Sequence, residues 1–185
     1  MKRIWVLVFT CLVSVGWLQG QTITFNVPGA GTASGQGTFG DVVAQGEGVP
    51  GWYGTVLGSY VDSSGVQHGF LRSPSGVITN VDPPGSVQTV SLGLDPILNF
   101  AGYYLDSNGV AHGFQNYDGN KSEFDAPGAG TAPGQGTFTA NINFNGTAGY
   151  YMDSNGTYHG FLNTYDGAFT TFDAPGAGTG LLKEL

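Results

Sequence analysis

The chain has almost no cysteine. Its single cysteine, Cys11, lies in a short apolar run, residues 4–17, which follows two basic residues and precedes Gly20. A basic start, a short apolar core and a small residue before a polar segment are typical of a secretory signal peptide. We therefore predict a signal peptide over residues 1–20, cleavage near Gly20, and secretion to the extracellular space or periplasm. The mature domain, residues 21–185, would contain no cysteine, which excludes a disulfide scaffold.

Basic clusters and long apolar runs are also missing. The chain has five basic residues, two of them in the predicted signal peptide, so three remain against 13 acidic residues, a net charge of −10. Such a chain has no basic patch to neutralise phosphates, which argues against nucleic acid and anionic membranes as partners. No run reaches the roughly 18 apolar residues of a spanning helix, so we predict no membrane span.

The common catalytic and cofactor motifs are absent as well. The sequence contains no Gly-x-Ser-x-Gly elbow, no His-Glu-x-x-His zinc motif and no phosphate-binding loop followed by a helix. After the signal peptide, apolar residues show no useful 3.6-residue period, which argues against helices. We therefore predict an all-β fold and assign no catalytic residue, metal ligand or cofactor.

What the chain does contain is an internal repeat. Three markers recur in a fixed order: His-Gly-Phe, Phe-Asp-Ala-Pro-Gly-Ala-Gly-Thr and Gly-Gln-Gly-Thr-Phe. The copies begin at His68, His112 and His159 for the first marker, at Phe124, Phe172 and, in diverged form, Phe25 and Val81 for the second, and at Gly35 and Gly134 for the third. They define repeat units at about residues 35–82, 88–125 and 134–173, with an enlarged loop at residues 45–52.

Each unit contains four short segments rich in β-branched and aromatic residues. In the third unit they cover residues 137–142, 147–152, 157–164 and 168–172. Asn-Gly or Asp-Gly pairs separate them, and these pairs are strong hairpin signals because glycine adopts a positive φ without a Cβ clash. Each unit is therefore predicted to be a four-stranded antiparallel meander, and the Pro-Gly-Ala-Gly segments are predicted to cross to the next meander.

Meanders of about 45 residues are typical of β-propeller blades. The repeated Gly-Tyr, Asp-x-x-Gly, His-Gly-Phe-Leu and Phe-Asp-x-Pro-Gly motifs over residues 22–179 resemble the bacterial extracellular HAF family, named for a His-Ala-Phe motif. This chain has glycine at the alanine position, at Gly69, Gly113 and Gly160. The resemblance implies a secreted, propeller-like protein without an established biochemical activity.

Three units are fewer than the four to eight blades of a closed propeller. We therefore predict a propeller-like array that is incomplete or open, with an extra N-terminal strand at residues 22–26, which match a fourth strand. Unpaired strand edges would make the chain prone to self-association.

A histidine and two aspartates recur at fixed positions of the repeat. The histidines are His68, His112 and His159, the aspartates of the Asp-Ser-(Ser/Asn)-Gly turns are Asp62, Asp106 and Asp153, and those before the crossings are Asp82, Asp125 and Asp173. We interpret each histidine as a polar group satisfied inside its blade, because a shared metal site would need imidazoles from separate blades to converge. The turn aspartates are predicted to accept backbone N–H groups in Asx turns, with weak calcium binding as the alternative. The crossing aspartates are predicted to cap their turns.

Candidate binding residues are the aromatic side chains found where the copies differ. They are Trp52 and Tyr53 in the enlarged loop, and Tyr117 and Tyr165 near the third-strand ends. Aromatic rings with a polar edge suit stacking against sugars. The leading hypothesis is non-enzymatic extracellular binding or adhesion, toward carbohydrate or another extracellular surface. The alternatives are an extracellular hydrolase or lyase with acidic residues at the blade axis, and a non-functional fragment of a longer repeat array.

Overall fold

Twelve β-strands form the regular structure of the described part of the chain. The computed structural model describes residues 23–44 and 54–178, and these ranges contain strands and no helix. The predicted signal peptide, the enlarged loop with Trp52 and Tyr53, and residues 179–185 lie outside the described residues. The prediction of an all-β fold is confirmed.

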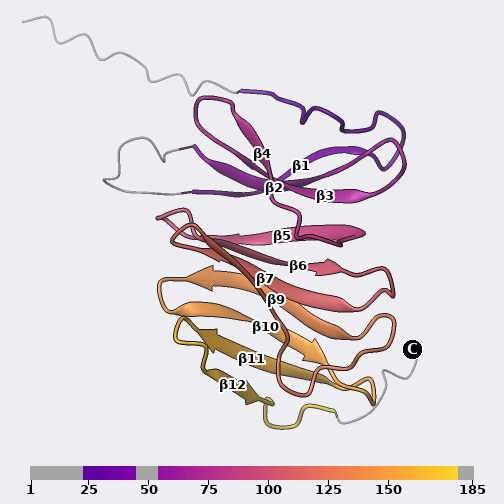
Figure 1. Cartoon of the computed structure of the whole chain (residues 1–185), viewed down its shortest axis with the longest axis vertical. Helices are drawn as coiled ribbons and strands as arrows, with labels where there is room; N and C mark the ends of the chain where they lie inside the picture. The colour runs from indigo at the N-terminus through magenta and orange to yellow at the C-terminus, as the bar shows by residue number, and fades with distance from the viewer. Residues whose placement is uncertain (1–22, 45–53, 179–185) are drawn as a thin grey trace, which may run out of the picture.

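The strands follow one another as three antiparallel meanders, which are stacked along the long axis of the molecule (Figure 1). The first meander consists of β1 (Gly37–Val43), β2 (Val56–Val61), β3 (Gln67–Arg72) and β4 (Ile78–Asn80). The second consists of β5 (Gln88–Leu94), β6 (Phe100–Leu105), β7 (Ala111–Tyr117) and β8 (Asn120–Phe124). The third consists of β9 (Gly136–Asn143), β10 (Gly146–Met152), β11 (Tyr158–Thr164) and β12 (Phe169–Phe172). The stack does not close on itself, as expected of an open array.

The two junctions between meanders are built differently. The second and third meanders share one eight-stranded sheet through a parallel pair between Ala111 and Gly136, whereas the first forms a separate four-stranded sheet. The pair depends on glycine, because Gly136 has a φ of 114° and an added Cβ would lie 2.1 Å from the Ala111 carbonyl oxygen. At the first junction Gln88 stands in the place of Gly136, and its side-chain amide donates to the Gln67 side chain at 3.2 Å. A side-chain bond there replaces the backbone pair.

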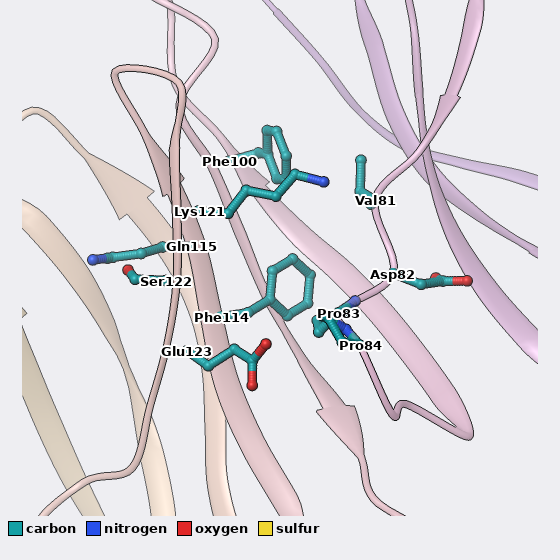
Figure 2. Close-up of a pocket in the computed structure, with 10 residues that line it drawn as sticks. All are labelled: Val81, Asp82, Pro83, Pro84, Phe100, Phe114, Gln115, Lys121, Ser122 and Glu123. Atoms are coloured by element: carbon teal, nitrogen blue, oxygen red, sulfur yellow. The ribbon is translucent and has the colours of Figure 1, made fainter.

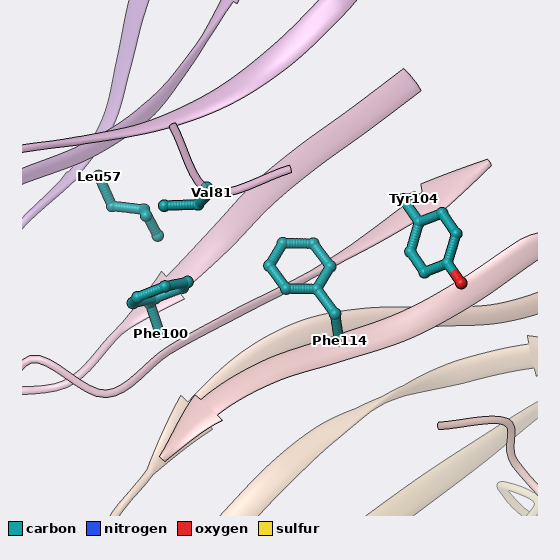
Figure 3. Close-up of a cluster of buried hydrophobic side chains, with 5 residues drawn as sticks. All are labelled: Leu57, Val81, Phe100, Tyr104 and Phe114. Carbon is teal, nitrogen blue, oxygen red and sulfur yellow. The ribbon is translucent and has the colours of Figure 1, made fainter. Parts of the chain in front are cut away.

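Each meander has a front face toward the preceding meander and a back face toward the following one. Leu57 and Val81, from the back face of the first meander, form one buried cluster with Phe100, Tyr104 and Phe114 from the front face of the second (Figure 3). The core of the molecule therefore lies between the meanders, since packing one face on another removes both from water.

The second junction repeats this arrangement with larger side chains. Tyr151 and Phe161, on the front face of the third meander, are buried in a cluster with Ala126, and Phe124 packs against it. Phe124 ends the second meander and takes the place that Val81 has in the first. The back face of the third meander has no such partner among the described residues.

Crossing segments connect each meander to the front face of the next. After β8, the Ala126 N–H donates to the Thr137 hydroxyl at 2.9 Å, which seats residues 126–135 on the third meander. The N-terminal segment copies this contact, because the Val27 N–H donates to the Thr38 hydroxyl at 2.9 Å.

The expected N-terminal strand is wrong for the residues that the structure describes. Residues 23–27 carry no strand pairing, although Phe25 packs edge-on against Phe70 with ring centroids 6.0 Å apart. A fourth strand pairs with the third strand of its own meander, as β12 does with β11. The described residues contain no meander ahead of β1 that could supply this partner, so the segment keeps the packing of a crossing and lacks the ladder of a strand.

Candidate functional site

Each repeat places its histidine between two aspartates and against a tyrosine ring. Nδ1 donates to the aspartate at the crossing: His68 to Asp82 at 2.7 Å, His112 to Asp125 at 3.0 Å and His159 to Asp173 at 2.8 Å. Nε2 faces the turn aspartate, at 3.5 Å from Asp62, 3.8 Å from Asp106 and 3.5 Å from Asp153. The ring stacks on Tyr60, Tyr104 or Tyr151 at centroid distances of 4.9, 5.2 and 4.9 Å. The crossing aspartates thus bind the histidines of their own repeats.

This geometry makes the histidine a structural link. Both ring nitrogens are directed at carboxylates of the same repeat, Nδ1 at the crossing aspartate and Nε2 at the turn aspartate. The hydrogen bond to Asp173 raises the pKa of His159, with a smaller contribution from Asp153, and burial only partly opposes it. Within residues 23–44 and 54–178, no group of three or more histidine, cysteine, aspartate or glutamate side chains is arranged to hold a metal ion.

The turn aspartates accept backbone hydrogen bonds in the manner of an Asx turn. The Asp62 Oδ1 accepts from the Ser64 N–H at 2.8 Å and from the Val66 N–H at 2.9 Å, and the other two repeats show the same pair of bonds. The bond from Val66 is the main reason why the pKa of Asp62 lies below its ordinary value. Gly65 follows with a φ of 88°, as the turn requires.

The two predicted binding tyrosines meet between the second and third meanders. The rings of Tyr117 and Tyr165 are stacked, with centroids 3.5 Å apart and planes 28° apart, and the Tyr165 hydroxyl donates to the Asn143 carbonyl oxygen. Burial raises the pKa of Tyr165 to about 12. One side of each ring is therefore occupied by the other ring. Trp52 and Tyr53, the other predicted binding residues, lie outside the described residues.

A cavity that sequence reasoning missed lies between the first and second meanders. It has a volume of about 270 Å³. Its walls are Val81, Asp82, Pro83 and Pro84 from the crossing after β4, Phe100 and Phe114 from β6 and β7, and Gln115, Lys121, Ser122 and Glu123 from β7 and β8. Figure 2 shows the Phe114 ring facing Pro83 and the Lys121 side chain extending below Phe100 toward Val81, whereas the Gln115 side chain points away.

The cavity exists because two aromatic residues of the repeat are missing at this junction. Between the second and third meanders, Phe124, Phe161 and Phe169 fill the same space, with ring centroids 5.9–6.1 Å apart. At the first junction Val81 replaces Phe124, and Lys121 takes the position of Phe169. A shorter side chain and a charged one therefore leave room beside Phe114, which occupies the place of Phe161.

The polar groups at the cavity differ in how far they are engaged. Glu123 accepts a hydrogen bond from the Tyr104 hydroxyl at 2.7 Å. Burial of Tyr104 and this bond to Glu123 both raise the pKa of the tyrosine well above its ordinary value. Lys121 is exposed, and within the described residues no ion pair includes it. The site thus offers apolar walls, an ammonium group and a carboxylate.

One sequence signal pointed to this place. The marker at Val81 is diverged, which shows that the first junction departs from the repeat. The exchange of Phe169 for Lys121 is visible only when β8 and β12 are aligned on their pairing with β7 and β11, where Ser122 opposes Gln115 and Thr170 opposes Leu162.

Comparison with known proteins gives no relative for this chain. No family model matches it, and neither curated proteins nor solved structures give a significant match. Among the described residues, no helix is long and apolar enough to cross a membrane.

Proposed function

We propose that the chain is a secreted, non-enzymatic repeat protein that binds carbohydrate outside the cell, and that the cavity between the first two meanders is its binding site. The observation that carries the proposal is the cavity of about 270 Å³ at the junction where the repeat aromatics are replaced. Its size is near the lower limit of ordinary ligand pockets, about 300 Å³. A single sugar ring is the class of ligand that fits this volume.

The chemistry of the walls supports a saccharide over an apolar ligand. The Phe114 ring and the prolines opposite it offer an apolar surface to the C–H face of a sugar. Lys121 and Glu123 stand at β8, where the ammonium donates to and the carboxylate accepts from hydroxyl groups. The full chain has only five basic residues and a net charge of −8. An exposed lysine beside an aromatic wall is therefore an uncommon feature of its surface.

We also propose that the chain is exported and that it is related to the HAF repeats. The sequence at residues 1–20 supports export, and the His-Gly-Phe and Phe-Asp-x-Pro-Gly markers support the relationship. A secreted binding protein needs no catalytic group. The histidines and aspartates of the repeats support this, because they bind one another within each repeat.

A glycan array with the purified chain tests the proposal. Lys121→Phe should fill the cavity as Phe169 fills the second junction, and it should weaken binding at least about tenfold, the equivalent of about 1.4 kcal/mol. Ile78→Phe is the matched control, because Ile78 has the same repeat position in the first meander and lines a separate groove. Binding by the control should be unchanged.

Two results would contradict the proposed site. If the wild-type chain binds no glycan, the carbohydrate function is wrong. If Lys121→Phe binds as the wild type does and Trp52→Ala abolishes binding, the site is the enlarged loop at residues 45–53.

A further inference from the structure

The back face of the third meander exposes side chains at repeat positions that are buried in the first meander and partly buried in the second. Tyr150 is 43% exposed, Leu162 38% and Phe172 57%. At the same repeat positions, Ser59 in the first meander is 4% exposed and Val81 is 3% exposed. The difference arises because a following meander covers the back faces of the first and second meanders, while β9–β12 form the lower end of the stack (Figure 1).

The front face of the first meander is open in a matching way. Val43 of β1, which lies on this face, is 53% exposed, and Phe39 of the same edge strand, which pairs with Ser59 and lies on the other face, is 45% exposed. The residue of the third meander that corresponds to Val43 is Ile142, which is 5% exposed because the second meander lies against it. The two ends of the stack therefore expose the two halves of the interface that recurs inside it.

The internal junctions show how these halves would fit. Tyr103, on the back face of the second meander, meets Phe138 of β9 edge-on, with ring centroids 5.1 Å apart. Tyr150 has the repeat position of Tyr103, and Phe39 has that of Phe138. Tyr150 on the free back face and Phe39 on the free edge strand β1 thus have the repeat positions of the two rings of an aromatic contact already present in the chain.

The backbone at both ends permits the same close approach. At the second junction an added Cβ on Gly113 would lie 2.7 Å from the Thr139 hydroxyl oxygen, so the glycine lets β9 lie close to β7. The corresponding residues at the free ends are Gly160 and Gly40. Around Gly40 an added Cβ would meet only Val56, at 3.5 Å, so this end has room for a neighbouring strand.

We propose that a second copy of this chain covers the free back face with its free front face, and that two copies close head to tail into a ring of six meanders. Six lies within the four to eight blades of closed propellers, whereas three copies would give nine. Each interface is heterologous, with Tyr150 of one copy against Phe39 of the other, and a twofold rotation makes the two interfaces equivalent.

In the closed ring, two phenylalanine side chains would compete for the same position on Phe70. Phe25 already occupies the position on Phe70 that Phe172 of the other copy would reach, because Phe124 reaches the corresponding position on Phe161 at the second junction. Phe172 is 57% exposed, and residues 173–178 after it are exposed as well. Phe172 and residues 173–178 can therefore move aside without losing buried contacts. Phe25 of the other copy then keeps its own position on Phe70.

Light scattering on the size-separated chain tests the ring, with Tyr150→Lys and Phe39→Glu as disrupting variants. The wild type should show twice the mass of one chain, and each variant alone should be a monomer. An equal mixture of the two variants should recover the dimer, because one interface then keeps both native residues and the other pairs lysine with glutamate. Thr131→Glu, at an exposed crossing residue, is the matched control and should stay dimeric.

Three outcomes overturn the proposal. A wild-type monomer at high concentration shows that the free faces do not dock. An open polymer shows that the copies associate head to tail but do not close into a ring of two. A dimer that survives both substitutions, with the circular dichroism of each variant unchanged, places the contact elsewhere.

Discussion

The glycine of the His-Gly-Phe marker gives a sharp test of how the meanders approach one another. Gly113 and Gly160 have the same repeat position, and neither has a positive φ, so alanine fits the backbone at both. An added Cβ on Gly113 would lie 2.6 Å from Phe124 Cε2 and 2.7 Å from Thr139 Oγ1. On Gly160 it would meet only the Phe172 ring, at 2.5 Å. Thr139 is fully buried in the next meander, whereas Phe172 is free to rotate into water.

The magnitude follows from two opposing effects. Overpacking a closely packed site costs about 1–3 kcal/mol. Replacing glycine by alanine at a compatible φ stabilises by about 0.4–1 kcal/mol, because the unfolded chain loses freedom. We therefore expect Gly113→Ala to lower the free energy of unfolding by about 1–2 kcal/mol, and Gly160→Ala to leave it unchanged or to raise it by up to about 1 kcal/mol. For a chain of this size, Gly113→Ala should lower Tm by about 2–8 °C.

Urea unfolding of both variants, followed by tyrosine and tryptophan fluorescence, provides the measurement. The wild-type m-value should be retained, so that the shift in midpoint reports stability alone. Equal effects of the two substitutions would refute the reasoning, because within one chain the added Cβ meets the buried Thr139 at Gly113 and only the exposed Phe172 ring at Gly160. With alanine at this position, Thr139 and Phe124 would have to shift to make room for the Cβ.

Three further predictions concern the polar links of the repeat. The pKa of His159 is raised by Asp173, so the stabilisation from this pair is complete below about pH 6.5 and is lost as the pH rises through the folded pKa; an NMR titration should show the raised pKa, and Asp173→Asn should lower it. The pKa of Asp106 is lowered, chiefly by its bond from a backbone N–H, so its stabilisation is present above about pH 3.8 and is lost as the pH falls through the folded pKa; Asp106→Ala should therefore reduce Tm at pH 7, and the difference from the wild type should vanish in strong acid. Thr137→Val should cost about 1–3 kcal/mol in urea unfolding, because it leaves the buried Ala126 N–H without an acceptor; a cost near zero would show that another group replaces the hydroxyl.

The strands of the third meander were predictable almost to the residue. The expected segments 137–142, 147–152, 157–164 and 168–172 correspond to β9–β12 at 136–143, 146–152, 158–164 and 169–172. Local chemistry sets these boundaries, because an Asn-Gly pair fixes a turn whatever lies across it. The Asx turn at Asp153 follows from the same kind of local rule.

Features between meanders were not predictable in this way. The cavity depends on Lys121 and Val81 meeting across a junction, and each is unremarkable within its own strand. Residues 22–26 carry the pattern of a fourth strand, yet pairing needs a third strand beside them, which no local pattern shows. Tyr117 and Tyr165 were expected as separate stacking sites, and their mutual stacking arises from the arrangement of two meanders.

The second junction has a glycine, Gly136, where the first has Gln88, and this difference affects the order in which the meanders unfold. Two backbone hydrogen bonds, from the Gly134 N–H to the Gly109 carbonyl and from the Ala111 N–H to the Gln135 carbonyl, hold the third meander to the second beside Gly136. Where Gln88 replaces that glycine, a side-chain amide bond takes their place. In a linear array the coupling between neighbours decides which units unfold together. We therefore expect the second and third meanders to unfold as one cooperative unit and the first meander to detach before them, an order that amide hydrogen exchange measures.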